Sequence, residues 1–158
     1  MNRREAIKMA IWGGAVVVLG RGRALAREYY PVEVDEALWK GINRAKNPGQ
    51  EEGLEKLHSP IIKAPNTVKA GDVFPVEVSI GRIPHPMGPT HWIENLQLNI
   101  GNEPAGNVIF RSHGYLKAAA KFNVFLGNEL KGKTASLIVQ IKCNLHGIWQ
   151  NYTNIKVA

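Results

Sequence analysis

The chain has 158 residues, of which 44% are hydrophobic and 21% are charged, so it can bury a core of its own as one globular domain. Its formal net charge is +7, but five Lys/Arg and one acid in residues 1–26 contribute +4, which leaves +3 for residues 27–158. Most of the basic excess therefore lies in the first segment, which argues against a basic nucleic-acid surface, and we expect no nucleic-acid partner.

The first 26 residues are laid out as an export signal. Arg3 and Arg4 precede a short apolar run at 11–19, and residues 24–26 read Ala-Leu-Ala, the small-residue form of a cleavage site. The order Arg-Arg-x-x-Ile-Lys is typical of a twin-arginine signal, which exports proteins already folded. The apolar run is about half the roughly 20 residues that span a bilayer, so we expect cleavage and a periplasmic or other extracytoplasmic location. An uncleaved signal would instead anchor the chain in a membrane.

Residues 27–53 are mixed and polar, and we predict an extension with a short helix at 35–40. From residue 54 to 158 the pattern changes, because apolar and polar residues alternate with a period of two. Turn residues such as those at 101–104 separate the alternating stretches. Short alternating strands at this spacing predict an all-β sandwich or barrel. The stretches lie at 76–80, 96–100, 108–110, 122–126, 137–143 and 152–157.

Cys143 is the only cysteine of the chain. Cysteines outside the cytoplasm normally pair in disulfides, so a single one leaves an intermolecular bridge, a buried inert thiol or a metal ligand. The alternation places Cys143 in phase with Leu137, Val139 and Ile141, facing the core at the point where its strand ends. We therefore expect a thiol that is half sheltered and half reachable at an end of the sandwich, where such domains place sites.

Four histidines lie close to predicted strand ends. His85 and His91 stand in the loop IPHPMGPTHW, His146 follows Cys143 by three residues, and His58 precedes the first predicted strand. Prolines stiffen the loop, and preorganised ligands lose little entropy on binding. Any one of these histidines taken alone would be read as polar surface, and Cys-x-x-His alone is a moderate signal. Together they predict a metal site.

The donor types restrict the metal. A thiolate with imidazoles favours zinc, copper or iron over magnesium or calcium. A structural zinc site is closed by four ligands, commonly with more sulfur, whereas five ligands suggest an octahedral metal with one open position. A trigonal copper site would use two histidines, one cysteine and a weak axial methionine, and the only methionine beyond the signal is Met87.

Four sequence blocks together resemble the superoxide reductase family, of the neelaredoxin and desulfoferrodoxin type. They are EKLHSPII at 55–62, HPMGPTHWIENLQL at 85–98, VIFRSHG at 108–114 and CNLHGIW at 143–149. The resemblance covers residues 54–158 and implies an immunoglobulin-like β-sandwich of about seven strands with one non-haem iron, cycling between Fe2+ and Fe3+. The implied ligands are four equatorial imidazoles and one axial thiolate, from His58, His85, His91, His146 and Cys143.

The resemblance also implies an activity, the one-electron reduction of superoxide to hydrogen peroxide at the open sixth position. An external electron donor would re-reduce the iron. Single-iron relatives imply a homo-oligomer, and one cysteine excludes the four-cysteine second iron domain of some members. No ligand role is implied for His113.

Two positions depart from the family pattern. In the family a Glu-Lys pair directly precedes the first ligand histidine; the Glu caps the oxidised iron and the Lys attracts the anion. Here Leu57 intervenes, so Glu55 and Lys56, carried over as catalytic residues, are each shifted by one place. A second histidine that often follows the family counterpart of His91 is replaced by Trp92.

Three other interpretations stay open on the sequence. The chain could be an exported electron-transfer or metal-binding protein with copper or iron and no superoxide turnover. It could be a sulfur-handling module of the exported thiosulfate type, with a reactive cysteine. It could also be a family member that kept iron but lost turnover, because of the shifted pair Glu55 and Lys56.

Overall fold

The computed structural model of the chain describes residues 40–112, 114 and 116–158. The predicted export signal, the helix predicted at 35–40 apart from Lys40, and His113 lie outside the described residues. Within the described part, no helix has the length and apolar character needed to cross a membrane.

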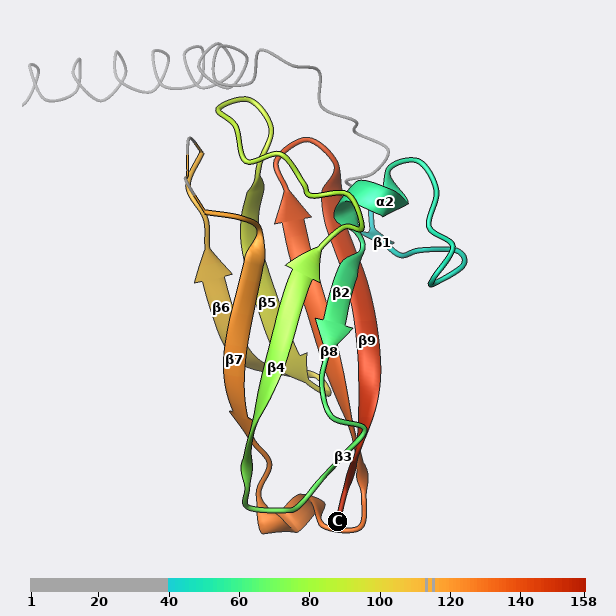
Figure 1. The fold of residues 1–158 in the computed structure, drawn as a ribbon, viewed down its shortest axis with the longest axis vertical. Helices are drawn as coiled ribbons and strands as arrows, with labels where there is room; N and C mark the ends of the chain where they lie inside the picture. The colour runs from blue at the N-terminus through green and yellow to red at the C-terminus, as the bar shows by residue number, and fades with distance from the viewer. Residues whose placement is uncertain (1–39, 113, 115) are drawn as a thin grey trace, which may run out of the picture. The chain divides into compact units, whose positions relative to one another are not determined.

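Nine strand segments form two sheets that face each other (Figure 1). The larger sheet has the order β1-β9-β8-β5-β6, with β3 also paired to β9, and the smaller sheet has the order β2-β4-β7. The two-residue segments β1 and β3 pair parallel to β9, and the other pairs are antiparallel. The bounds are β1 Ile42–Asn43, β2 Pro60–Lys63, β3 Thr67–Val68, β4 Val73–Ile80, β5 Ile93–Ile100, β6 Glu103–Ile109, β7 Ala119–Phe125, β8 Thr134–Cys143 and β9 Gly147–Val157.

The core lies between the sheets and follows the predicted period of two. Burial alternates along all eight residues of β4 and all ten of β8. Leu137, Val139 and Ile141 are completely buried, and each such side chain contributes about 1.5–3 kcal/mol of burial free energy. The predicted all-β sandwich is confirmed. The turn predicted at 101–104 is shorter than expected, because Pro104 lies within β6, an edge strand where its missing N–H need not break a ladder.

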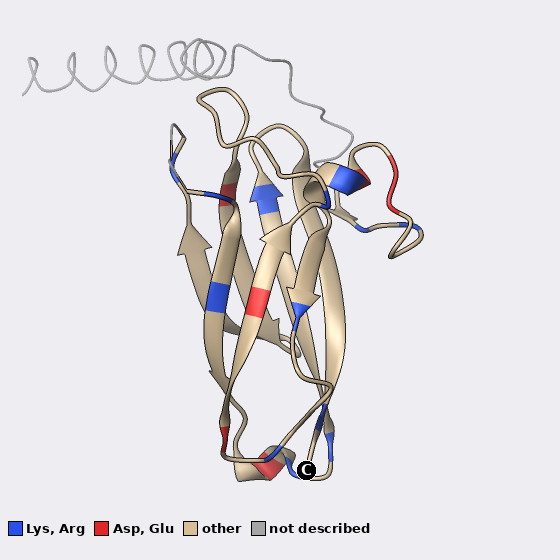
Figure 2. Cartoon of the chain, viewed as in Figure 1, with Lys and Arg blue, Asp and Glu red and all other residues tan. Residues whose placement is uncertain are grey.

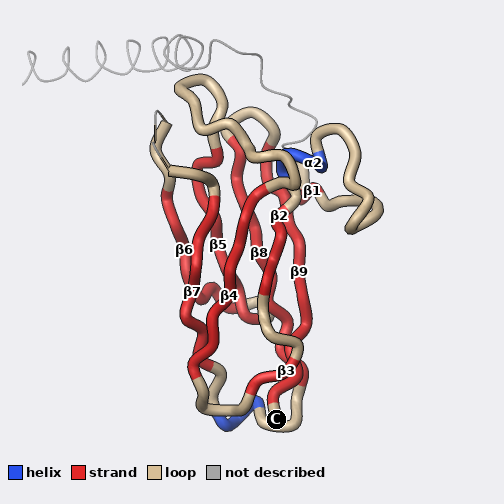
Figure 3. Tube along the Cα trace, in the orientation of Figure 1, coloured by secondary structure: helices blue, strands red, loops and turns tan. Residues whose placement is uncertain are grey.

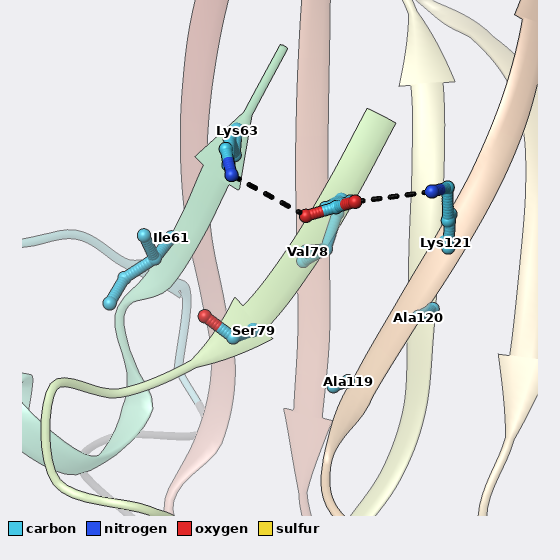
Figure 4. Close-up of a pocket in the computed structure, with 8 residues that line it drawn as sticks. Ile61, Lys63, Val78, Ser79, Ala119, Ala120 and Lys121 are labelled. Atoms are coloured by element: carbon cyan, nitrogen blue, oxygen red, sulfur yellow. Dashed lines mark ion pairs between the residues drawn. The ribbon is translucent and has the colours of Figure 1, made fainter. Parts of the chain in front are cut away.

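The outer faces carry charges of both signs, interspersed over the described surface (Figure 2). On the smaller sheet, a carboxylate oxygen of Glu77 lies 3.9 Å from Nζ of Lys63, and the other lies 3.2 Å from Nζ of Lys121 (Figure 4). A shallow depression beside these ion pairs is lined by residues such as Ile61 and Ser79, and no histidine or cysteine lines it. This face is therefore a solvated sheet surface without the chemistry of the predicted site.

Short helices lie at opposite ends of the sandwich (Figure 3). The 3-10 helix η1, Asn128–Leu130, lies near the C-terminal end of β9, whereas α2, Glu55–His58, lies at the other end. The sequence did not predict α2. The β4–β5 loop and the β8–β9 turn reach the same end as α2, so segments far apart in the sequence meet there (Figure 1).

Candidate metal centre

The predicted ligands come together at this end of the sandwich. His58 is the last residue of α2, His85 and His91 belong to the β4–β5 loop, and Cys143 is the last residue of β8. One ligand atom from each of these four residues lies within 4.8 Å of the other three. All are buried except His91, which is half-buried.

His146, in the β8–β9 turn, faces the same group through Nδ1. This atom lies 3.0 Å from Nε2 of His58, 3.2 Å from Nε2 of His91 and 3.6 Å from Sγ of Cys143. The structure therefore brings together all five side chains that the sequence proposed as ligands.

The four imidazoles form a square. Ring centroids of neighbours around the square are 4.5–4.8 Å apart, with the ring planes 72–75° from each other, whereas His58 and His91 lie across a diagonal at 5.9 Å. On three of the four sides, the nitrogens that face one another are 3.0–3.2 Å apart. Dividing by √2 gives about 2.1–2.3 Å from each nitrogen to the centre of a square, close to the length of a metal–imidazole bond.

Backbone carbonyls fix which nitrogen of two imidazoles carries the proton. Nδ1–H of His58 donates to the carbonyl oxygen of Leu54 at 2.7 Å, and Nδ1–H of His85 donates to that of Pro86 at 2.6 Å. In the neutral rings Nε2 then bears a lone pair, and these two lone pairs face each other at 3.1 Å. Neither can donate to the other, so the arrangement suits a cation between them, with the outer nitrogens held as in known metal sites.

Burial keeps these imidazoles neutral. Desolvation lowers the pKa of His58 to about 4 and that of His85 to about 3, and the neighbouring histidines add to both shifts. Desolvation, together with the nearby His146, also lowers the pKa of His91. Neutral imidazole is the form that binds a metal, so the site is ready for one over the physiological pH range.

The thiol of Cys143 is completely buried, which corrects the expectation of a half-reachable group. Burial raises its pKa to about 11, although the backbone N–H groups of Leu145 and His146 hydrogen-bond to the sulfur and act in the opposite direction. A buried thiol with a raised pKa is a poor nucleophile. A metal ion would displace its proton and convert it to the thiolate ligand.

The family assignment follows from a match over most of the described domain. A family model described as Desulfoferrodoxin matches residues 50–152, more than half of the chain. The chain belongs to the desulfoferrodoxin family. The family resemblance of the sequence blocks is thus confirmed, and the donor set of histidines and one cysteine is a metal-binding cluster typical of this family.

Individual relatives of this desulfoferrodoxin-family chain support the same assignment. A Methanocaldococcus jannaschii protein with a provisional superoxide reductase name is 36% identical over 110 residues, which cover 70% of this chain and 89% of the relative. The Pyrococcus abyssi superoxide reductase is 34% identical over 106 residues, which cover 63% of this chain and 87% of the relative. The solved superoxide reductase (neelaredoxin) from Ignicoccus hospitalis is 31% identical, with a TM-score of 0.62 over 80% of this chain and all of that one.

The two predicted catalytic residues lie on α2, separated from the first ligand histidine by Leu57. The carboxylate of Glu55 accepts a hydrogen bond from the backbone N–H of Lys46 at 3.3 Å, so it is engaged with the preceding loop. Lys56 is exposed, and its carbonyl oxygen accepts from the N–H of Ile83 in the β4–β5 loop. Neither belongs to the described group of ligand atoms within 4.8 Å, and their catalytic roles remain predictions.

Several supporting residues were not predicted. Trp149 stacks on His58 with centroids 5.2 Å apart, and its Nε1–H donates to the carbonyl oxygen of His146 at 2.8 Å. Gly81, with φ of +73°, lies so close to α2 that an added Cβ would meet the carbonyl oxygens of Lys56 and Leu57 at 2.6 Å. The glycine directly after the predicted strand at 76–80 was the only sequence signal for this contact.

Proposed function

We propose that the chain is a superoxide reductase with one non-haem iron held by His58, His85, His91, His146 and Cys143. The facing lone pairs of His58 and His85, within a square of four imidazoles beside a buried thiol, carry this proposal. The reaction consumes one superoxide, one electron and two protons, and releases one hydrogen peroxide. Bound iron would supply the electron by cycling between Fe2+ and Fe3+.

The residues of the chain prepare the site for this chemistry. The carbonyls of Leu54 and Pro86 hold the rings of His58 and His85 in their ligand orientation, which lowers the entropy lost on binding. Trp149 covers His58, which keeps water from that side. Cys143, whose Sγ lies 3.6 Å from Nδ1 of His146, would hold the metal as the fifth donor, and superoxide would take the position that the five donors leave open. As a thiolate it would donate electron density to the metal, as an axial thiolate does in haem enzymes.

We assign anion capture to Lys56. Its ammonium is exposed on the same helix as His58, and a positive charge beside a site raises the encounter rate of a small anion. Glu55 is the family counterpart of a capping carboxylate, but its hydrogen bond to Lys46 gives it a tethering role here. We therefore propose that Lys56 attracts superoxide to the site and that Glu55 does not bind the metal during the reaction.

The cellular setting is part of the proposal. The twin-arginine-like segment at 1–26 would export the protein, with iron already inserted, to the periplasm or another extracytoplasmic space. Residues 27–53 would form an extension and residues 54–158 the iron-binding domain. Part of the extension contacts the sheet, because Nδ2 of Asn43 donates a hydrogen bond to the carbonyl oxygen of Ile148. We further propose a homo-oligomer and an external electron donor.

Two features disfavour the copper and the sulfur-handling interpretations. Four imidazoles in a square differ from the two-histidine trigonal copper site, and Met87 packs partly buried against the core. A sulfur-handling module needs a reachable, nucleophilic thiol, whereas Cys143 is buried with a raised pKa.

The test is rapid mixing of the reduced, iron-loaded protein with superoxide. We expect oxidation of the iron chromophore and release of one hydrogen peroxide per superoxide without release of dioxygen. Equal yields of dioxygen and hydrogen peroxide from two superoxide molecules would instead show dismutation and contradict the proposal.

A further inference from the structure

Asn144 lies between the thiol ligand and the rest of the β8–β9 turn, and it is only 2% exposed. Its side-chain Oδ1 accepts a hydrogen bond from the backbone N–H of Trp92 at 2.8 Å, and its Nδ2 donates to the carbonyl oxygen of Thr90 at 2.9 Å. Its backbone N–H donates to the carbonyl oxygen of Trp92 at 3.2 Å. One buried residue of the hairpin thus makes three bonds to the β4–β5 loop.

These bonds surround one ligand. Thr90 and Trp92 are the two sequence neighbours of His91, so Asn144 holds the backbone on both sides of that imidazole. His91 is the half-buried member of the cluster, and among the described residues β5 begins only at Ile93, so strand pairing does not hold His91 in place. The position of His91 relative to Cys143 therefore depends on Asn144.

The same bonds bear on the thiol. The N–H of Asn144 is committed to Trp92, and the next two N–H groups, of Leu145 and His146, hydrogen-bond to Sγ of Cys143. Hydrogen bonds to a metal-bound sulfur tune the metal. A shift of the turn would move both N–H groups at once, so the anchor at Asn144 also fixes how strongly the buried sulfur is hydrogen-bonded.

We propose that Asn144 is a positioning residue that locks His91 and the thiol turn into one unit, so that the third imidazole and the sulfur keep a fixed separation. The amide meets both needs, because its oxygen accepts from the N–H of Trp92 and its nitrogen donates to the carbonyl of Thr90. This inference rests on the metal centre of the proposed function, but it concerns ligand geometry and needs no superoxide.

The test uses cobalt(II) as a probe in the full chain, with Asn144→Ala, Asn144→Ser and a matched control, Asn99→Ala. Asn99 is also a buried amide, 7% exposed, but its side-chain partner is Gln97 and it lies near the far end of β5. The measurements are cobalt affinity by competition with a chelator, the position of the thiolate-to-cobalt absorption band, and the melting temperature of the metal-free protein.

We expect Asn144→Ala to weaken cobalt binding by about 10–100-fold and to shift the thiolate band, as loss of an outer-shell partner does elsewhere. Asn144→Ser, which introduces a shorter hydroxyl that can donate and accept, should lie between Ala and the unaltered protein. Asn99→Ala should lower only the melting temperature. This pattern separates positioning from plain stability.

Cobalt affinity within about twofold of the unaltered protein, with an unshifted band, would overturn the inference. If Asn144→Ala does not fold, the same criterion applies to Asn144→Ser. Failure of the unaltered protein to bind cobalt would contradict the metal centre itself, and with it both proposals.

Discussion

The two regions that supply the ligands reach the cluster by different means. Cys143 and His146 belong to a hairpin whose strands pair along all ten residues of β8, so the sheet register sets their positions. His58, His85 and His91 come from a four-residue helix and from the loop at 81–92. That second region depends on individual tethers: two imidazole–carbonyl bonds, the close approach of Gly81, and Asn144.

The difference indicates how each region should fail. In the hairpin, a substitution removes a donor and leaves the frame intact, because the ladder does not depend on that side chain. In the loop and helix region, loss of a tether should leave every donor present but misplaced. Substitution of a donor in the hairpin should therefore abolish the thiolate-to-iron absorption or a ligand bond outright. Substitution of a tether in the loop and helix region should instead lower the metal affinity by degrees.

The largest effect is expected for Cys143→Ser. The thiolate-to-iron colour should vanish and turnover should fall by at least about 100-fold, because loss of a ligand should cost no less than loss of an outer-shell partner. The absorption spectrum and stopped-flow oxidation by superoxide measure both. Ala135→Ser, an inward-facing buried position near the other end of β8, is the control and should keep colour and rate. Persistence of colour in Cys143→Ser would contradict the axial assignment.

A loop-region tether is broken by Gly81→Ala. The added methyl group would meet three carbonyl oxygens at 2.6 Å, which should displace α2 and weaken metal binding by about 10–100-fold, as loss of outer-shell support does. Gly101→Ala is matched in backbone strain, since φ is +60°, but its Cβ would meet nothing within 4 Å. Metal titration compares them. Equal affinity in both variants would show that α2 is not held by this contact.

Acid and alkali should destabilise the metal-free protein through different regions. His58 titrates at about 4 when folded and near its ordinary 6.5 when unfolded, so the free energy of unfolding should fall as pH drops from 6.5 to 4. The pKa of Cys143 is about 11 when folded and near its ordinary 9.0 when unfolded. The free energy of unfolding should therefore fall again as pH rises from 9 to 11.

Denaturant unfolding at a series of pH values measures the free energy of unfolding in both pH ranges. Cys143→Ser should remove most of the fall between pH 9 and 11 (the alkaline limb) and leave the fall between pH 6.5 and 4 (the acid limb) unchanged. An alkaline limb that survives this substitution would place the relevant titration elsewhere in the chain.

The smallest effect is expected for Lys56→Ala. Capture of superoxide should slow by about two- to fivefold at low salt, because one steering charge is lost, and the difference should shrink as salt screens it. Lys131→Ala removes an exposed charge at the opposite end of the sandwich and should have no effect. The measurement is the second-order rate constant for reaction with superoxide over a series of salt concentrations. The same salt dependence in both variants would show that Lys56 does not take part in capture.

The hairpin was also the more predictable region. Alternation alone predicted the strand through Cys143 and the inward direction of its side chain, because apolar and polar residues alternate along a half-buried strand. The same reasoning missed the full burial of the thiol, since His58, His85 and His91, whose ligand atoms lie within 4.8 Å of the sulfur, come from distant segments. It missed α2 as well, because four residues are too few for a helical period to show.

The candidate ligands were found by type and spacing, but their arrangement was beyond the sequence pattern. His146 and His58 are 88 residues apart in the chain and 3.0 Å apart at their nitrogens. The supporting positions were harder still. Gly81 and Asn144 act on backbone atoms of other segments, and such contacts leave no trace in hydrophobic periodicity.

The most direct measurement is elemental analysis together with an electronic spectrum of the protein purified from its native host. We predict one iron per chain, with a thiolate charge-transfer band in the oxidised state that bleaches on reduction. Stoichiometric copper or zinc in place of iron, or iron without a thiolate band, would contradict the account.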